Sequence, residues 1–450
     1  MSDQWASGPR AEPAPLRVAV LGCGVVGTEV VRRMHDARDE LAERVGVPLE
    51  LAGIAVRHPG RDRGLGVDPG LWTDDALGLI ERDGIDIVVE LLGGLEPARS
   101  LVIRAMERGA SVVSANKALL AAHGPQLHES AARHGVDLLY EAAVAAAVPV
   151  LGPLRDCLCG DRIDRITGVV NGTTNYILDR MTRTGGDYAS ALQEAIACGY
   201  AEADPSADVE GTDAAAKAVI LSSLAFHTWP DPTQVYREGI TGVTAQDVAD
   251  ARACDRVVKL VALLERSVEP DGSTVVLARI RPTMVARHHP LAHVGGADNA
   301  VLVEAHVAGP LLFRGAGAGG VPTSGPVLGD LVTAARRRLQ GRFAAGPPLA
   351  VRAPERPAGA QAVAGLRSRH HLRVPVHDPT LAQAEAGAVL TRANIGITSI
   401  RAAADARALL ILTADIEETV LAQTVAELAA LPSVSGGPRS LPLLDAEEDR

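Results

Sequence analysis

Aromatic side chains are scarce in this 450-residue chain, of which they make up only 2%. Proteins that recognise nucleobases or sugars by stacking need aromatic faces, so this scarcity argues against that kind of recognition. An excess of basic residues is also missing, because the formal net charge is −11. Such a balance disfavours binding to nucleic acid or to an anionic membrane, although it is compatible with a local basic pocket for a phosphate.

Cysteine is scarce as well. The chain has five cysteines, at Cys23, Cys157, Cys159, Cys198 and Cys254. An odd and sparse set of cysteines indicates reduced thiols in a cytosolic protein. The C-x-C formed by Cys157 and Cys159 has no second pair nearby, so we interpret both as packing residues rather than zinc ligands.

Long apolar runs are the third absence. No uninterrupted apolar run reaches the length that spans a membrane, and residues 1–15 (MSDQWASGPRAEPAP) lack the apolar core of a signal peptide. We therefore expect no membrane partner, a disordered N-terminus over residues 1–15 and a cytoplasmic protein.

The first motif that carries chemistry is a glycine-rich turn between a strand and a helix. An apolar run at residues 16–21 leads into GCGVVG at residues 22–27 and then into a helical pattern. In a G-x-G-x-x-G turn the first glycine permits the tight turn, the second admits a pyrophosphate and the third lets helix and strand pack closely. The residues that would contact a dinucleotide here are Gly22, Gly24, Val25, Val26 and Gly27. The alternative is a glycine-rich turn without a ligand.

The strand expected at Leu49–Val56 addresses the choice of dinucleotide. Proteins that prefer NAD usually place an acidic residue at the end of this strand, where it binds the ribose 2′-hydroxyl. Here the strand ends at Arg57, and Arg61 and Arg63 follow. Because arginine suits a 2′-phosphate, we expect NADP, with NAD or dual use as the alternative. A solvated basic loop is the other interpretation.

Strands and helices continue to alternate up to about residue 149, which predicts an α/β domain with a parallel sheet. Two loops fall at the carboxyl ends of expected strands, where such sheets bind ligands. One loop contains Gly93 and the other, SANK at residues 114–117, contains Lys117. Lys117 is therefore a candidate for the nicotinamide crevice, although a lysine at a strand end is often only a surface residue.

An acidic stretch with a single basic residue, GYAEADPSADVEGTDAAAK, occupies residues 199–217. If a helix starts near Thr212, Asp213 and Lys217 are four residues apart and lie on one face. A lysine held beside carboxylates could bind a small zwitterion and transfer a proton. The alternative is a solvated acidic loop with one surface ion pair.

The remaining patterns predict the domain organisation. We expect a Rossmann-type domain at residues 16–149 and an α+β substrate and oligomerisation domain at residues 150–340, with a helix over Ala245–Leu264 and a last helix that returns to the first domain. A linker at residues 341–368, a small βαβ-type α+β domain at residues 369–436 and a solvated acidic tail at residues 437–450 would follow.

Over about residues 16–340 the chain resembles the homoserine dehydrogenase family. The segments that carry the resemblance are GCGVVG at 22–27, SANKALL at 114–120, VNGTTNYIL at 170–178, GYAEADPSADVEGTDAAAK at 199–217 and GAGAGGVPT at 315–323. Residues 369–432 resemble the ACT domain that many members carry. No kinase region precedes residue 16, so the resemblance is to a monofunctional enzyme.

The resemblance implies NAD(P)H-dependent interconversion of aspartate 4-semialdehyde and L-homoserine. It makes Lys217 the general acid/base, Lys117 a second cation near the nicotinamide, and Glu202 and Asp213 ligands of the substrate's amino group. Gly199 and Gly317 would line the cofactor and substrate crevice. The implied structural Na⁺ site consists of Glu141 and the main-chain carbonyls of Val144, Ala146 and Val148. A homodimer or homotetramer and a threonine effector are implied as well.

Two departures from the family pattern leave alternatives open. The chain has Ala146-Ala147 where the family usually has a glycine pair, so a positive φ there would add strain at the ion site. The C-terminal domain has Thr380 where an Asp-x-Pro-Gly turn is common, so a purely structural domain is the alternative to a threonine sensor. The alternatives are a paralogue that reduces another amino-acid semialdehyde and a non-catalytic amino-acid sensor.

Overall fold

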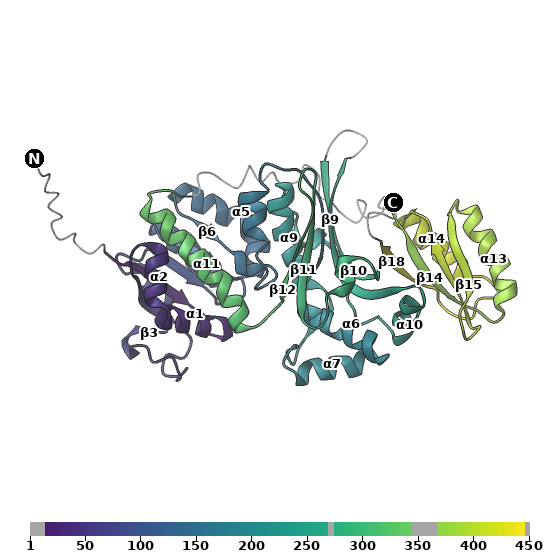
Figure 1. The fold of residues 1–450 in the computed structure, drawn as a ribbon, viewed down its shortest axis with the longest axis horizontal. Coiled ribbons are helices and arrows are strands. Elements are labelled where there is room, and N and C mark those ends of the chain that lie inside the picture. The colour runs from purple at the N-terminus through teal and green to yellow at the C-terminus, as the bar shows by residue number, and fades with distance from the viewer. Residues whose placement is uncertain (1–13, 269–273, 344–366, 446–450) are drawn as a thin grey trace, which may run out of the picture. The chain divides into compact units, whose positions relative to one another are not determined.

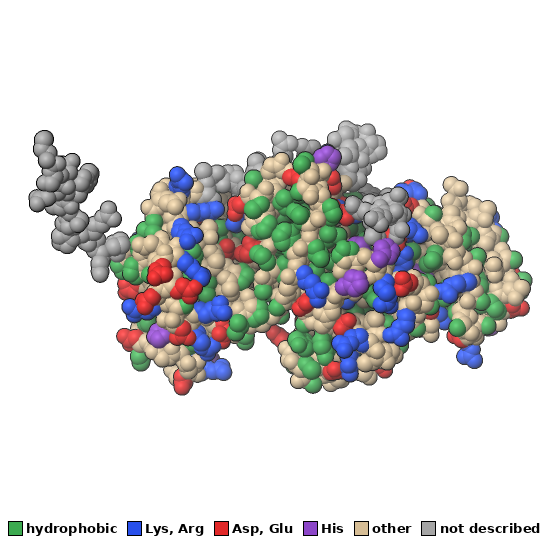
Figure 2. All heavy atoms as spheres, in the orientation of Figure 1, with side chains coloured by type: hydrophobic (Ala, Val, Ile, Leu, Met, Phe, Trp, Pro, Cys, Tyr) green, Lys and Arg blue, Asp and Glu red, His purple; other side chains and the backbone are tan. Residues whose placement is uncertain are grey.

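The computed structural model describes residues 14–268, 274–343 and 367–445 (Figure 1). Most of the expected disordered N-terminus and most of the expected linker lie outside these ranges. The chain forms two compact units, of which the first comprises Met1–Ala147 and Gly319–Leu349 and the second Val148–Ala318 and Ala350–Arg450. Figure 2 shows acidic and basic side chains interspersed on the face that it draws.

The first unit is built on a six-stranded parallel sheet. Its strands are β1 (Leu16–Leu21), β2 (Leu49–Ala55), β3 (Trp72–Thr73), β4 (Ile87–Glu90), β5 (Ser111–Ser114) and β6 (Leu138–Leu139). They are arranged in the order β3-β2-β1-β4-β5-β6, the doubly wound order of dinucleotide-binding folds. The predicted α/β class with a Rossmann-type domain is therefore confirmed.

Helices α1 to α5 lie between these strands in sequence, and α11 joins the unit from later in the chain. They are α1 (Val25–Asp36), α2 (Arg38–Val45), α3 (Ala76–Glu81), α4 (Ala98–Glu107), α5 (Lys117–His134) and α11 (Gly320–Leu339), with short 3₁₀ turns η1 (Pro69–Leu71) and η2 (Glu141–Ala143). The expected strand and helix positions include neither α2 nor α3. Both are short, and α2 exposes most of its surface.

Helix α11 belongs to the first unit although the second unit separates it from the rest in sequence (Figure 1). It packs beside α1, and Val327 and Leu331 share a buried cluster with Val18 and Val30. Gly320 permits this approach, because a Cβ at that position would lie 2.9 Å from the Val25 carbonyl oxygen. Two ion pairs, Arg337–Asp137 at 3.0 Å and Arg338–Asp86 at 2.8 Å, fasten the other end of the helix.

The second unit is built on a mixed sheet. Its strands are β7 (Ile163–Val169), β8 (Tyr236–Arg237), β9 (Arg256–Val268), β10 (Thr274–Ala286), β11 (Asp298–Ala305), β12 (Gly309–Ala316), β14 (His370–Pro375), β15 (Ile397–Ala402), β16 (Ala408–Thr413) and β18 (Arg439–Leu444). The order is β12-β11-β7-β9-β10-β18-β14-β16-β15, with β8 paired to β10. Strands β13 (Arg367–Ser368) and β17 (Ile416–Glu417) form a separate pair.

The helices of the second unit are α6 (Gly172–Thr184), α7 (Tyr188–Ala197), α8 (Ser206–Val209), α9 (Thr212–Phe226), α10 (Ala245–Ala253), α13 (Pro379–Arg392) and α14 (Glu418–Ala429), with the short turns η3 (Pro153–Cys157), η4 (Pro232–Gln234) and η5 (Pro290–His293). The predicted single helix over Ala245–Leu264 is wrong. It ends at Ala253, Asp255 takes a left-handed φ of 55°, and β9 begins at Arg256. Long antiparallel pairing with β10 overrides the helical pattern.

The predicted solvated tail at residues 437–450 is also wrong for its first part. Residues 439–444 form β18, which pairs with both β10 and β14, and Leu441, Leu443 and Leu444 are buried. Asp445 accepts a hydrogen bond from Arg369 at 2.7 Å and is ion-paired with Arg256. Residues 446–450 lie outside the described ranges. The apolar side chains of this segment, rather than its acidic end, determine its structure.

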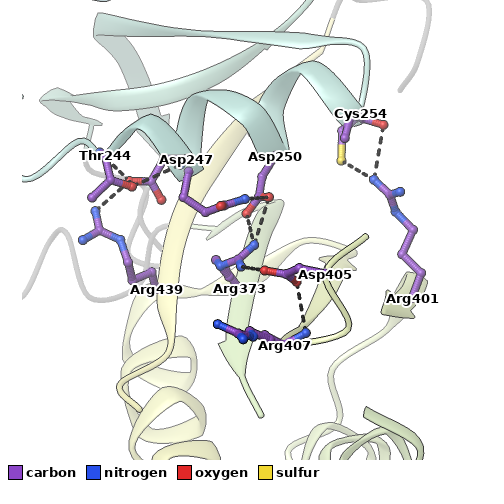
Figure 3. A network of polar contacts seen from close by, with 11 residues as sticks. Thr244, Asp247, Asp250, Cys254, Arg373, Arg401, Asp405, Arg407 and Arg439 are labelled. Carbon is purple, nitrogen blue, oxygen red and sulfur yellow. Dashed lines mark hydrogen bonds and ion pairs between the residues drawn. The ribbon is translucent and has the colours of Figure 1, made fainter. Parts of the chain in front are cut away.

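With β18, the C-terminal part has the order β14-α13-β15-β16-α14-β18, a ferredoxin-like βαββαβ arrangement. Its likeness to an ACT domain stays a prediction. Arginines of this part bind α10 and its end (Figure 3). Arg373 pairs with Asp250 at 2.9 Å and Arg439 pairs with Asp247 at 3.0 Å. Since both aspartates are buried, these bonds and the shared strand make the C-terminal part continuous with the main sheet.

Candidate active site

The glycine-rich turn has the geometry that a dinucleotide requires. Gly22 has a φ of +95°, and a Cβ there would lie 2.6 Å from the Leu91 carbonyl oxygen. A Cβ at Gly27 would overlap the Gly22 carbonyl oxygen, whereas a Cβ at Gly24 would meet no atom of the described chain within 4 Å. Gly22 and Gly27 thus serve the fold, and the open space at Gly24 suits a phosphate that approaches the backbone.

The N-terminus of α1 supplies donors at this turn. No side chain of the described residues caps the helix, and Val25, its first residue, is 75% exposed. Main-chain N–H groups at an uncapped helix start, together with the helix dipole, bind phosphates. The residues present therefore fit a dinucleotide without any charged side chain in the turn.

Arg57 and Arg63, which follow β2, differ in their contacts. Arg63 donates hydrogen bonds to the carbonyl oxygens of Cys23 at 3.3 Å and Arg61 at 2.8 Å, and its guanidinium group lies 4.9 Å from the centre of the Trp72 ring. Arg63 thus fastens the loop after β2 to the glycine-rich turn. Arg57 is exposed and lies two residues after the end of β2.

A buried carboxylate, which our sequence analysis missed, organises the carboxyl ends of β4 and β5. Glu90 is fully buried and accepts hydrogen bonds from Ser114 Oγ at 2.6 Å and Asn116 Nδ2 at 3.3 Å. It also accepts bonds from the main-chain N–H groups of Leu92 at 2.9 Å and Gly93 at 3.4 Å. Glu90 therefore shapes the two loops that sequence analysis selected. A glutamate at the end of an otherwise apolar strand was the available signal.

Lys117 is the first residue of α5 and is half-buried. Asn116 caps this helix by accepting a bond from Leu119 N at 3.1 Å, while its amide group donates to the Gly94 carbonyl oxygen at 2.8 Å. Because β1, β4 and β5 are parallel neighbours, Lys117, Gly93 and the glycine-rich turn lie at the same edge of the sheet.

In the second unit, Lys217 and Asp213 form a buried ion pair on α9. Lys217 Nζ lies 2.6 Å from Asp213 Oδ2, and the side chains are only 8% and 4% exposed. Lys217 also donates to the Val170 carbonyl oxygen at 2.6 Å. The pair is thus not the exposed surface pair of the alternative interpretation, because both charges are withdrawn from solvent.

The VNGTTN segment surrounds this pair. Asn171 donates hydrogen bonds to Asp213 Oδ2 at 2.9 Å and to Asp208 Oδ1 at 2.6 Å. Asn299, from the start of β11, donates to the Val170 carbonyl oxygen at 3.2 Å and the Gly317 carbonyl oxygen at 3.4 Å. A Cβ at Gly317 would lie 2.5 Å from Asn299 Oδ1, so only glycine permits this approach. Neither Asn171 nor Asn299 carries a local pattern that predicts it individually from the sequence.

Two predicted substrate residues are not part of this cluster. Glu202 is exposed and forms no hydrogen bond or ion pair with the described residues. Gly199 is exposed, with a φ of +76°, just after α7. The structure therefore brings Asp213 and Lys217 together but leaves Glu202 and Gly199 on the surface of the acidic loop.

The loop after η2 contains alanines with positive φ, as the Ala146-Ala147 pair had suggested. Ala145 and Ala146 have left-handed φ values of 57° and 49°, whereas Ala147 is not among the residues with positive φ. Both strained alanines are buried. A left-handed alanine costs about 1–2 kcal/mol relative to its ordinary conformations, so this loop is held in place by its surroundings.

The other expected ion ligands lie around this loop. Glu141 is buried in η2, and its main-chain N–H donates to Asp330 Oδ2 at 2.7 Å. Val144 belongs to the first unit with Glu141, whereas Val148 belongs to the second. Within the described ranges, no group of three or more His, Cys, Asp or Glu side chains could hold a metal. An ion here would depend mainly on main-chain carbonyls.

Comparison with known families identifies the class. A family model described as the NAD-binding domain of homoserine dehydrogenase matches residues 22–141, and one described as homoserine dehydrogenase matches residues 149–332. The fold, the glycine-rich turn and these matches define an NAD(P)-dependent oxidoreductase. In the described part of the chain, no helix has the length and apolar character to cross a membrane.

Individual homoserine dehydrogenases are similar to this chain over most of its length. The chain is 46% identical to a homoserine dehydrogenase of Corynebacterium glutamicum, over 95% of this chain and 97% of that protein, and 49% identical to one of Mycobacterium tuberculosis, over 86% of each. The crystal structure of a homoserine dehydrogenase from Thiobacillus denitrificans superposes with a TM-score of 0.88 at 34% identity, over 96% of this chain and 99% of that one. The chain belongs to the homoserine dehydrogenase family.

Proposed function

We propose that Lys217 is the general acid/base in the interconversion of aspartate 4-semialdehyde and L-homoserine. The observation that supports this role is the burial of Lys217 with its ammonium group 2.6 Å from both Asp213 Oδ2 and the Val170 carbonyl oxygen. A buried lysine with fixed partners is restricted in conformation, as proton transfer at one substrate atom requires.

The chemistry follows from this arrangement. In the reductive direction the bound nicotinamide would supply a hydride to the aldehyde carbon. The carbonyl oxygen accepts a proton from the Lys217 ammonium group, and the product is an alcohol. Lys117 is the second cation that offsets negative charge on the oxygen during hydride transfer. In the reverse direction neutral Lys217 removes the hydroxyl proton.

Asp213 has two proposed roles. Its carboxylate holds Lys217, and it also belongs to the set that binds the substrate's amino group. Glu202 is the other member of that set, and Gly199 would line the substrate crevice. Since Glu202 has no partner among the described residues, its carboxylate is available for a cationic ligand. Gly317, which lies against Asn299, would line the cofactor and substrate crevice.

We further propose that the cofactor is NADP(H) and that Arg57 binds the 2′-phosphate. The exposed position of Arg57 at the end of β2 and the fastening of the loop by Arg63 support this role. A homoserine dehydrogenase from a hyperthermophilic archaeon, solved in complex with NADPH, superposes with a TM-score of 0.60 at 27% identity, over 71% of this chain and 98% of that one. NAD is the alternative.

Three further proposals concern regulation and assembly. A structural Na⁺ ion would be bound by Glu141 and by the carbonyls of Val144, Ala146 and Val148. Threonine would act on the C-terminal domain, and the enzyme would be a homodimer or homotetramer. The five cysteines are free in the structure, which supports a reducing compartment such as the cytoplasm.

The decisive experiment follows NADPH absorbance with aspartate 4-semialdehyde for the parent and for Lys217→Ala. Fast oxidation by the parent and a loss of orders of magnitude in the variant, with unchanged NADPH binding, are expected. Repeating the assay with NADH tests Arg57, and adding threonine tests the effector. Near-parental turnover by Lys217→Ala would contradict the assigned role.

A further inference from the structure

A second buried lysine, Lys259, lies in the second unit and has no role in the reaction described above. It is on β9, in the segment that the sequence pattern had suggested was helical, and it is only 2% exposed. No carboxylate of the described residues lies within ion-pairing distance of its ammonium group. Burying a charge without a carboxylate partner is costly, so the hydrogen bonds that it forms need an explanation.

Those hydrogen bonds go to the first turns of α6 and to Val294, the residue that follows η5. Lys259 Nζ donates to Asn175 Oδ1 at 2.8 Å and to the Val294 carbonyl oxygen at 2.6 Å. The amide group of Asn175 donates to the Val294 carbonyl oxygen at 3.0 Å and to the Asp298 carbonyl oxygen at 3.1 Å. Lys259 and Asn175 thus hold α6 to the segment that leads into β11.

Both ends of this network reach the Lys217 site. Asn171, one turn before Asn175, caps α6 through a bond from Thr174 N at 2.8 Å and donates to Asp213. Asn299, the residue after Asp298, donates to the carbonyl oxygen of Val170, which also accepts a bond from Lys217.

The backbone is closely packed at the same point. A Cβ on Gly172, the first residue of α6, would lie 2.6 Å from the Ala297 carbonyl oxygen. The start of α6 therefore rests directly on residue 297, between the two attachment points of Asn175 at Val294 and Asp298. A displacement of this turn would move α6 and its capping residue together.

We propose that Lys259 is a positioning residue of the reaction: through Asn175 and the Val294 carbonyl oxygen it holds the junction of β7 and α6, and thereby Asn171 and Val170, against the Asp213–Lys217 pair. Two lysines from different elements hold this junction, Lys217 from α9 at Val170 and Lys259 from β9 at Asn175. The inference rests on the proposed role of Lys217.

The test compares Lys259→Met, Asn175→Leu and the double variant. Lys259→Met keeps an apolar stem of similar length but leaves Asn175 Oδ1 buried without its donor, which destabilises the fold. The double variant also removes the side-chain donors of the Val294 and Asp298 carbonyl oxygens, so its melting temperature should stay below that of the parent. Its kcat should stay about 10–100-fold low, because α6 is no longer tied to Val294 and Asp298. The KM for NADPH should be unchanged.

The controls separate positioning from stability. Val303→Ala, a truncation of a fully buried side chain on β11 outside this network, should lower the melting temperature without lowering kcat of the folded enzyme. Parental kcat in Lys259→Met, or parental kcat in the double variant, would overturn the inference. If Lys217→Ala retains turnover, the proposed acid/base role fails instead, whatever the Lys259 variants do.

Discussion

The two units recognise their ligands with different parts of the chain. In the first unit the candidate cofactor site is made of main chain: three glycines, an uncapped helix start and loops held by the buried Glu90. In the second unit the candidate chemistry is made of side chains, with Asp213 and Lys217 buried in a network of asparagines. Substitutions of Asp213, Lys217 and their asparagine partners should therefore change kcat, whereas those in the glycine-rich turn and around Glu90 should change cofactor affinity or stability.

The largest effect is expected for Lys217→Met. Loss of a general acid/base typically lowers the rate by about 10²–10⁴-fold, and this lysine also offsets charge on the substrate oxygen. We expect a fall in kcat near the upper end of that range and an unchanged dissociation constant for NADPH. Stopped-flow and fluorescence titration would measure the two. Weakened NADPH binding of similar size would break the division between the units.

Asp213→Asn should have a smaller effect. The substitution keeps the size of the side chain but removes its charge, and it places a donor near the donors of Asn171 and Lys217. A hydrogen bond to a charged group contributes about 1.5–3 kcal/mol, so kcat should fall roughly 10–100-fold. Asp208→Asn, which alters the other partner of Asn171, is the matched control and should lose less.

The pH dependence of stability should report the burial of Lys259. Burial is the main reason that the pKa of Lys259 falls from 10.5 to about 8, with Asp179 opposing the shift and Arg314 adding to it. Between pH 8 and 10.5 the unfolded chain therefore retains a proton that the folded chain has released. Stability from this residue should rise with pH across that window, by at most about 3 kcal/mol.

Urea unfolding of the parent and of Lys259→Met at several pH values would measure this term. The difference in free energy of unfolding, parent minus variant, should increase from pH 8 to 10.5 and be flat below pH 8. A difference that is constant across the whole range would mean that Lys259 keeps its ordinary pKa in the folded protein.

Arg57→Ser should produce a still smaller effect, confined to the cofactor. If Arg57 binds a 2′-phosphate at an exposed position, KM for NADPH should rise about 10-fold, because one charge-assisted bond is lost. KM for NADH and kcat with either cofactor should stay near parental values. Equal changes for NADPH and NADH would exclude a contact with the 2′-phosphate.

The same division explains what could be predicted from the sequence. The glycine-rich turn and the Asp213–Lys217 spacing are local patterns whose geometry is decided within a few residues. Asn299 and Lys259 act on partners far along the chain, so no local window reveals them. For Glu90 the local signal was a carboxylate that ends an apolar strand, but its partners Ser114 and Asn116 lie in a distant loop. Lys259 was hidden further because its strand had a helical pattern up to the point where pairing with β10 overrides it.

The error at the C-terminus has a similar cause. The charges at the end of the chain suggested a solvated tail, yet Leu441, Leu443 and Leu444 fill a place between β10 and β14. This position in the sheet is formed by β10 and β14, two strands that are distant from each other in sequence. The composition of a short segment could not show that a strand was missing there.

The smallest expected effect tests the loop after η2, where alanine adopts a conformation that suits glycine. Ala145 and Ala146 have positive φ and Ala147 does not. Ala146→Gly should relieve left-handed strain of about 1–2 kcal/mol, partly offset by the greater freedom of glycine in the unfolded chain. A net stabilisation of about 0.5–1 kcal/mol is expected. Ala147→Gly, with no strain to relieve, should destabilise by a similar amount. Calorimetric shifts of the same sign in both variants would show that backbone strain is not what distinguishes the two positions.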